Sequence, residues 1–261
     1  MDKRKTVFIT GASGNMGFET LRLLKESKRY RLRLLVLPDK AGRAKMRIYT
    51  DDPDITITWG DLTEYDDVSE ALGDAELVLH MGALIPPAAD HHPEAARKIN
   101  YGGTLNVIRA VQSSPVADVA LVFIGTVAES GNRLPPVHWE RVGDPIMISR
   151  NDAYAESKVM AERAVIESGL KHWVSLRQTA MLHFNLFSLL DPIIYHQPLE
   201  THMEWITVFD AARALFGLTE RYFGNTLPGN FWQTVYNIGG GADFRKTNIE
   251  FMQRAFRLLG I

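Results

Sequence analysis

The sequence of 261 residues contains no cysteine. Disulfide frameworks and zinc sites with thiolate ligands are therefore excluded, and a chain without thiols suits the cytoplasm, where we expect it to be located. It also has no apolar run near the roughly 18 residues that a membrane-spanning helix needs. The first residues are too polar for a signal-peptide core. We therefore expect no membrane association.

An excess of charge of one sign is missing too, because 29 Lys and Arg residues accompany 31 Asp and Glu residues, for a formal net charge of −2. A nucleic-acid-binding protein normally presents a strongly basic face, so we expect no nucleic-acid partner. The eight histidines are scattered along the chain. His91 and His92 are adjacent but lack the spacing of metal ligands on a helix, so we expect no metal site.

What the sequence does contain is an alternation of short apolar, β-branched runs with longer segments of helical period. This alternation predicts βαβ units and an α/β fold with a doubly wound parallel sheet. The predicted strands are residues 6–10, 32–37, 55–59, 77–80, 119–124 and 173–177. The predicted helices are residues 15–25, 93–112 and 152–168, the last one capped by Asp152 and stopped at Gly169.

Beyond residue 178 the pattern loosens. Residues 184–195 are apolar but broken by a proline. The remaining predicted elements are a short helix at 209–218, a strand at 231–238 and a final helix at 248–259. We therefore divide the chain into a core, 1–178, and a small C-terminal region, 179–261, whose late strand and helices return to the core.

A glycine-rich segment joins the first predicted strand directly to the first predicted helix. Glycine tolerates positive φ in a tight turn, and close approach to a pyrophosphate leaves no space for a Cβ. The N-terminus of the following helix offers unpaired N–H groups to phosphates. The segment therefore predicts dinucleotide binding, with a plain tight turn as the alternative. The expected contact residues are Gly11, Ser13, Gly14, Asn15, Met16 and Gly17.

Tyr154 and Lys158 lie four residues apart on a predicted helix, within reach of a common point. A free phenol, with a pKa near 10, is a slow proton donor at neutral pH. A nearby ammonium favours the phenolate and lowers its pKa, and each unit of lowering corresponds to roughly 1.4 kcal/mol. The spacing alone is common on surface helices, but its position after the fifth predicted strand and the glycine-rich segment favours a catalytic role. We therefore predict that Tyr154 gives and takes a proton beside Lys158 while a hydride is transferred.

Together these segments resemble the extended short-chain dehydrogenase/reductase family, which includes nucleotide-sugar epimerases, dehydratases and ketone reductases. The likeness covers about residues 6–240 and is carried by Thr10–Gly17, Gly60-Asp61-Leu62, His80-Met81-Gly82-Ala83, Asn100-Tyr101-Gly102-Gly103-Thr104, Tyr154-Ala155-Glu156-Ser157-Lys158 and Val208-Phe209-Asp210-Ala211-Ala212. It implies a Rossmann fold with bound NAD(P) and a C-terminal substrate-binding region. It further implies that Asp61 and Leu62 contact the adenine, that Gly82 and Ala83 lie beside the cofactor, and that Lys158 also holds the nicotinamide ribose.

The resemblance also implies a hydroxyl that orients the substrate oxygen. The family usually has a Ser-Ser pair after the fifth strand, where this chain has Gly125-Thr126. Thr126 is our candidate, with Ser130 as the second choice. Asn100 would complete a tetrad by holding a water or the backbone geometry near Lys158. A second departure is Arg177-Gln178, where the family usually has Arg-Pro.

The choice between NAD and NADP depends on the end of the second strand, where an acid favours NAD and an Arg favours NADP. Leu37 stands at that position and indicates neither, and Asp39 follows it. Lys40, Arg43 and Lys45 crowd the same predicted loop. We lean to NADP with Lys40 in the cofactor site, the alternative being that these cations are simply solvated.

Three functions remain open. The first is an NAD(P)-dependent oxidoreductase that transfers hydride between the nicotinamide and a ketone, aldehyde or alcohol. The second is a nucleotide-sugar epimerase that uses NAD transiently; a dehydratase is disfavoured because Val127-Ala128 replaces the expected Asp-Glu pair. The third is a non-catalytic NAD(P)-binding sensor or scaffold.

We expect a small-molecule substrate. Apolar and aromatic residues in the substrate-side segments hint at a moderately apolar one: Met81, Leu84, Ile85, Trp139, Met181, Phe184, Phe187, Trp205 and Phe231. Proteins of the resembled family often dimerise through helices equivalent to 93–112 and 152–168, so a homodimer is a further expectation.

Overall fold

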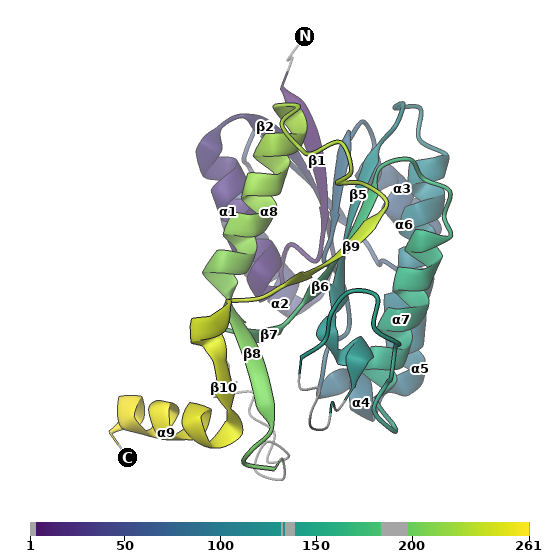
Figure 1. The fold of residues 1–261 in the computed structure, drawn as a ribbon. Helices are drawn as coiled ribbons and strands as arrows, with labels where there is room; N and C mark the ends of the chain where they lie inside the picture. The colour runs from purple at the N-terminus through teal and green to yellow at the C-terminus, as the bar shows by residue number, and fades with distance from the viewer. Residues whose placement is uncertain (1–3, 132, 134–138, 184–197, 261) are drawn as a thin grey trace.

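A parallel sheet with helices on both faces forms the body of the protein, and a smaller sheet lies at one end (Figure 1). The computed structural model describes residues 4–131, 133, 139–183 and 198–260. Within these residues no helix combines the length and the apolar character needed to cross a membrane. The apolar segment 184–195 of the sequence analysis lies outside the described residues.

The central sheet has seven strands in the order β3-β2-β1-β4-β5-β6-β9, and every neighbouring pair is parallel. Its strands are β1 (Lys5–Thr10), β2 (Tyr30–Val36), β3 (Ile55–Trp59), β4 (Leu77–His80), β5 (Ala120–Thr126), β6 (Trp173–Gln178) and β9 (Thr234–Ile238). This confirms the predicted doubly wound α/β fold. The strand order reverses between β1 and β4, and ligands bind such folds at the carboxyl edge of that switch point.

Helices cover the sheet in two layers (Figure 1). The longer ones are α1 (Asn15–Ser27), α3 (Tyr65–Leu72), α6 (Gly103–Gln112), α7 (Ala153–Ile166) and α8 (Val208–Phe223). α1 packs against α8 on one face, while α6 packs against α3 and α7 on the other. Because both faces are covered, the central strands are apolar along their length, and β5 is buried throughout.

The smaller sheet consists of β7 (Ala180–Leu182), β8 (His202–Thr207) and β10 (Arg245–Thr247). β7 runs parallel and β10 antiparallel to β8. α9 (Asn248–Leu259) leaves this sheet from a capping box, and its Phe251 ring stacks on Trp205 at 4.5 Å. Figure 1 places the sheet below the carboxyl ends of the central strands.

Several predicted elements have the observed bounds, namely the strands at 55–59 and 77–80 and the helix at 248–259. The predicted helix at 209–218 extends to Phe223, and the strand predicted at 231–238 begins at Thr234. α3 and β8 were not predicted, because such short elements carry little periodicity.

The predicted loop that carries Lys40 is instead a helix, α2 (Lys40–Met46). Asp39 begins it, because its carboxylate accepts a hydrogen bond from the Gly42 N–H at 2.6 Å and so caps the first turn. The shorter helical turns of the chain are α4 (Ala88–His91), α5 (Pro93–Ala96), η1 (Arg47–Tyr49), η3 (Val127–Ser130) and η6 (Ala242–Phe244).

The helix predicted at 93–112 is divided into α5, a π turn η2 (Arg97–Gly102) and α6. The π turn coincides with Asn100, whose side chain bonds both backbone groups of Leu84. These tertiary contacts compete with a regular helix, and π turns often accompany functional sites.

The glycine segment after β1 is too tight for side chains at two of its positions. Gly11 has φ of 72°, and a Cβ there would lie 2.7 Å from the Gly82 nitrogen. A Cβ at Gly17 would lie 2.1 Å from the Gly11 carbonyl oxygen. The turn therefore brings the first residues of α1 against the end of β1 and the segment after β4.

This crowding predicts opposite effects for two helical glycines. We expect Gly17→Ala to lower the free energy of unfolding by about 2 kcal/mol or more, because neither backbone partner can move aside freely. Gly217→Ala, in α8, should raise it by up to about 1 kcal/mol, because open space surrounds that position. Chemical denaturation measures both, and equal effects would contradict the crowded turn.

Candidate active site

The first turn of α1 is free of side-chain caps. Gly14 occupies the N-cap position, no side chain caps it, and the first turn carries no acidic residue. The N–H groups of Asn15, Met16 and Gly17 therefore face the carboxyl edge of the sheet with the positive end of the helix dipole. Together with the missing Cβ atoms of the turn, this arrangement fits a diphosphate.

The segments after β3 and β4 meet beside this turn, as the resemblance implied. A Cβ at Gly82 would contact Leu62 at 3.3 Å, and Asn106 donates to the Leu62 carbonyl oxygen at 3.1 Å. Asp61 accepts a hydrogen bond from the Thr63 N–H at 2.8 Å through one carboxylate oxygen. The structure thus brings Asp61, Leu62 and Gly82 to the same edge as the glycine turn.

A chain of buried hydrogen bonds joins the end of β1 to the π turn through His80. Thr10 Oγ1 lies 2.7 Å from His80 Nδ1, and His80 Nε2 lies 2.9 Å from Thr104 Oγ1. The Gly82 N–H donates to Thr10 Oγ1, and the Thr104 hydroxyl donates to the Asn100 carbonyl oxygen.

Only one direction of donation satisfies this chain. Because the single hydroxyl proton of Thr104 goes to a carbonyl oxygen, Thr104 must accept from His80 Nε2–H. His80 Nδ1 is then an acceptor for the Thr10 hydroxyl. Burial, together with the nearby charge of Lys158, lowers the pKa of His80 to about 3, so the imidazole is neutral.

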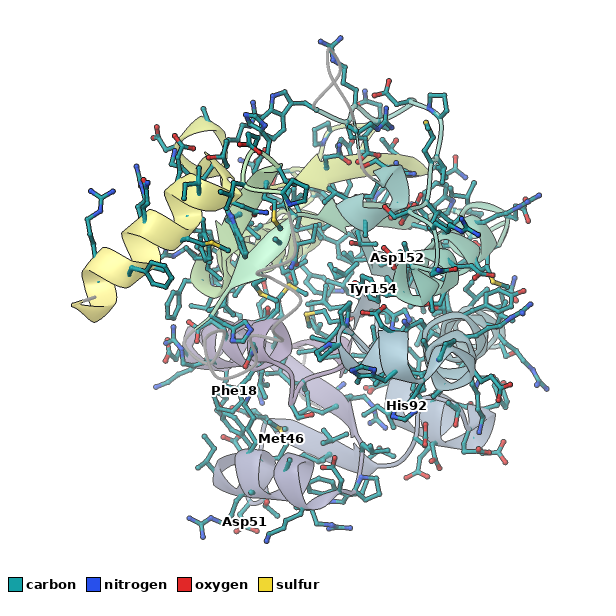
Figure 2. All side chains as sticks on the ribbon, turned by 90° about the horizontal axis from the view of Figure 1, so that it is seen from below. Phe18, Met46, Asp51, His92, Asp152 and Tyr154 are labelled. Carbon is teal, nitrogen blue, oxygen red and sulfur yellow. The ribbon has the colours of Figure 1, made fainter. Side chains whose placement is uncertain are left out.

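The Tyr154 side chain approaches Thr126 at the carboxyl end of β5, closely enough for Thr126 to lower its pKa. Asp152 fixes the start of α7 by accepting from the Ala155 N–H at 2.7 Å. Figure 2, which looks from below at this edge, shows Tyr154 between the C-terminal elements and the core helices. One turn along α7, Lys158 is 4% exposed and donates to the Ile124 carbonyl oxygen at 2.6 Å.

The expected lowering of the Tyr154 pKa by Lys158 is wrong for this structure. Burial raises the pKa of Tyr154 to about 12, and the nearby Thr126 only partly opposes it. Burial also lowers the pKa of Lys158 to about 8. The physical reason is that the Lys158 ammonium is directed to a carbonyl oxygen and lies 4.1 Å from the centre of the Phe123 ring.

Asn100 is 1% exposed, and its side chain holds two segments of the site together. It accepts from the Leu84 N–H at 2.7 Å and donates to Ser157 Oγ at 2.9 Å, next to Lys158. This geometry suits the backbone-positioning role. The hydroxyl of Ser130, the second choice for orienting the substrate, instead donates to the Val127 carbonyl oxygen at 2.7 Å within its own turn.

A buried cluster of acids surrounds Arg177 near Lys158, and the sequence analysis did not predict it. The guanidinium contacts Glu162 at 2.5 Å, Glu140 at 2.8 Å and Glu129 at 3.4 Å. Glu129 is fully buried, and within the described residues neither of its carboxylate oxygens has a hydrogen-bond donor. The available signal was that Glu162 follows Tyr154 and Lys158 at the same spacing of four residues.

The cations near the end of β2 lie on α2, and they differ in their approach to the glycine turn. Lys40 is exposed. Lys45 lies 3.4 Å from the Gly14 carbonyl oxygen and 4.9 Å from the centre of the Phe18 ring. Arg43 stacks over Trp59 at 4.7 Å. Lys45 is therefore better placed than Lys40 to meet a phosphate.

No group of three or more His, Asp or Glu side chains in the described part of the chain has the geometry of a metal site. A doubly wound sheet, an uncapped glycine turn and a tyrosine–lysine pair at its carboxyl edge define an extended short-chain dehydrogenase/reductase. The chain belongs to the NAD-dependent epimerase/dehydratase family, whose sequence profile matches residues 7–190.

Curated relatives include two different activities. The chain is 30% identical to a UDP-glucose 4-epimerase of Rickettsia bellii over 125 residues, which are 45% of this chain and 36% of that protein. It is 25% identical to the rat 3 beta-hydroxysteroid dehydrogenase type 7 over 162 residues, which are 61% of this chain and 47% of that protein. The matched regions thus span less than half of each relative.

Solved structures agree on the fold. The dTDP-glucose 4,6-dehydratase of Bacillus anthracis, in complex with NAD, superposes with a TM-score of 0.76 at 17% identity. The superposition covers 98% of this chain and 81% of that one. At this identity the likeness establishes the Rossmann architecture.

The neutral His80 predicts a pH-dependent stability. Below the ordinary histidine pKa of 6.5 the unfolded chain takes up a proton that folded His80 refuses until about pH 3. The stabilising contribution is therefore present above pH 6.5 and is lost as the pH falls. Between pH 7 and pH 5 the wild type should lose about 2 kcal/mol more unfolding free energy than His80→Gln.

Urea denaturation at the two pH values measures this difference. His91→Gln, at an exposed position on α4, serves as the control and should keep the wild-type pH dependence. The same loss in wild type and His80→Gln would contradict a buried, neutral His80.

Proposed function

We propose that the protein is an oxidoreductase that transfers hydride between a nicotinamide cofactor and a ketone, aldehyde or alcohol, with Tyr154 as the proton donor and acceptor. The observation that carries the proposal is the closeness of the Tyr154 and Thr126 side chains at the carboxyl end of β5, on the edge where the uncapped glycine turn lies. A carbonyl oxygen next to both hydroxyls would be oriented and protonated there.

The residues on this edge suit a dinucleotide. The α1 N–H groups would hold the diphosphate, and Asp61 and Leu62 would contact the adenine. Gln178 pairs with Thr126 across β5 and β6, and both Gln178 Oε1 and Thr179 Oγ1 are buried with no hydrogen-bond partner among the residues that the structure describes. These polar atoms suit an amide-bearing ligand such as nicotinamide. Bound there, the cofactor supplies or accepts the hydride.

The two pKa values support distinct roles for the pair. With its pKa raised to about 12, Tyr154 keeps its proton at neutral pH and can give it to a reduced carbonyl oxygen. Lys158, with a pKa of about 8, is largely protonated at neutral pH, and its positive charge favours the tyrosinate formed by this step. Lys158 would also hold the ribose hydroxyls of the cofactor, and Asn100 positions its helix through Ser157.

The structure favours NADP over NAD through the cations of α2. Asp39, the acid nearest the position that selects NAD, is occupied as the cap of that helix. Lys45 approaches the glycine turn, and Arg43 presents its guanidinium over Trp59. These two cations would meet a 2′-phosphate, and the exposed Lys40 lies at the start of the same helix.

A nucleotide-sugar epimerase is the second candidate, favoured by the family and by the matched UDP-glucose 4-epimerase. The same tyrosine and lysine would act, but the hydride would return to the substrate. We place the substrate in the region 179–261 under both functions. Turnover with no net change in nicotinamide absorbance would favour the epimerase, and a stoichiometric change would favour the oxidoreductase.

Removal of the phenol hydroxyl tests the catalytic role. Tyr154→Phe should reduce the rate of hydride transfer by about 10² to 10⁴-fold while dinucleotide affinity is retained. Tyr222→Phe, whose hydroxyl contacts the Glu76 carbonyl oxygen away from the site, should keep wild-type turnover. Stopped-flow nicotinamide fluorescence over a panel of ketones and sugar nucleotides provides the readout. An active Tyr154→Phe protein would refute the assigned role.

The cofactor preference is tested by titrating NADH and NADPH. The wild type should bind NADPH more tightly, and Lys45→Met should weaken NADPH binding about 10- to 100-fold with a small effect on NADH, since one charge-assisted contact is lost. Lys171→Met, on an exposed lysine paired with Asp118, is the control. Equal affinities of the wild type for both nucleotides would contradict the preference.

A further inference from the structure

Helix α7 carries a third ionisable side chain, Glu162, in line with its tyrosine and lysine. Tyr154, Lys158 and Glu162 follow one another at intervals of four residues and so share one face of the helix. Glu162 is 2% exposed and accepts hydrogen bonds from Ser175 Oγ at 2.6 Å and from Arg177 Nη2 at 2.5 Å. The row formed by these three side chains thus extends from the proposed site into the buried acid cluster.

Glu129 approaches this cluster from the other side. It lies in η3, three residues after Thr126, and is 0% exposed. Its ion-pair partner is Arg177, at 3.4 Å, and no donor in the described part of the chain reaches either of its oxygens. A fully buried carboxylate without a donor is costly, whereas a protonated carboxyl donates its own hydrogen bond.

The charges of the cluster do not balance when every acid is ionised. Two buried cations, Arg177 and Lys158, accompany three carboxyl groups, those of Glu129, Glu140 and Glu162. One added proton makes the set neutral. Glu129 is the group that needs it, because Glu140 and Glu162 each have a short contact to the guanidinium.

The cluster is made possible by the glycine that departs from the family pattern. A Cβ at Gly125 would lie 2.9 Å from Ser175 Oγ and 3.1 Å from Glu162 Oε2. A serine at this position would therefore displace Glu162 from its partners. The position of Glu162 in the cluster therefore depends on the glycine at position 125.

We propose that the acid cluster holds one shared proton at neutral pH, carried by Glu129, and that Glu129 is a positioning residue that sets the charge of Lys158 during proton transfer by Tyr154. The positioning role of Glu129 rests on the proposed function. The shared proton does not, because it follows from the acid cluster alone.

The groups packed around Glu129 determine how it responds to pH. Glu162 and Lys158 face it from α7, and Arg177 faces it from β6. Glu140 contacts the same guanidinium, and the charges of Glu129 and Asp152 raise the pKa of Tyr154. Burial and the neighbouring Glu162 raise the pKa of Glu129 to about 8. Above that pH the new negative charge favours the ammonium of Lys158 and disfavours the tyrosinate.

Infrared spectroscopy of the whole chain tests the shared proton without any turnover. The wild type should show the carbonyl stretch of a buried carboxylic acid at neutral pH, and this band should disappear as the pH rises through about 8. Glu129→Gln should lack the band, and Glu129→Asp should restore it. Absence of the band in the wild type, or its survival in Glu129→Gln, would overturn the proposal.

The pH dependence of hydride transfer tests the positioning role. In Glu129→Gln the apparent pKa of the alkaline limb should fall by about one pH unit, because the charge that opposes the tyrosinate is gone. Glu129→Asp should recover the wild-type profile. Glu167→Gln, at an exposed glutamate of the segment after α7 that pairs with Arg163, should leave it unchanged.

The two tests separate the possible failures. A wild-type profile in Glu129→Gln, measured on active protein, would refute the positioning role. A chain that shows the infrared titration but no hydride transfer with any substrate would count against the proposed function and would support the shared proton.

Discussion

The site depends on the buried hydrogen-bond chain through His80. The imidazole joins Thr10, at the start of the glycine turn, to Thr104 and thereby to the carbonyl oxygen of Asn100. The same asparagine holds Leu84 and Ser157 with its side chain. One neutral histidine therefore links the dinucleotide turn to the helix that carries Tyr154 and Lys158. Thr10, neutral His80 and Thr104 each have a single side-chain proton to donate, so the direction of the hydrogen bonds between them is specified.

Burial controls the ionisation of the groups around this chain. It keeps His80 neutral, raises the pKa of Tyr154 and lowers that of Lys158. The acid cluster around Arg177 supplies negative charge that partly compensates the buried charge of Lys158. Buried groups of this kind titrate together, so the proton-transfer step belongs to the network more than to one residue.

Much of the fold follows from local sequence signals. The apolar strands, the glycine turn and the Asp152 cap are each contained in a few neighbouring residues, and the sequence analysis located them. The Tyr154–Lys158 pair also follows from spacing along one helix. The π turn at Asn100 was missed because it depends on contacts with Leu84, sixteen residues away.

The acid cluster was missed for a related reason. Glu129, Glu162 and Arg177 meet only through the register of β5 with β6 and the packing of α7 on both strands. Gly125 and Gln178 looked like unexplained departures from the family pattern until their neighbours were known. Helix α2 was missed for another reason. Its capping residue, Asp39, is a local signal in the sequence, but the segment that follows it was interpreted as a loop.

Nitrogen-15 NMR of the His80 side chain tests the central linkage most directly. The account predicts a proton on Nε2 and a bare Nδ1 at neutral pH, with a hydrogen-bond coupling from Nε2 toward Thr104. The opposite tautomer, or an imidazole protonated on both nitrogens, would break the direction of the chain and contradict the account.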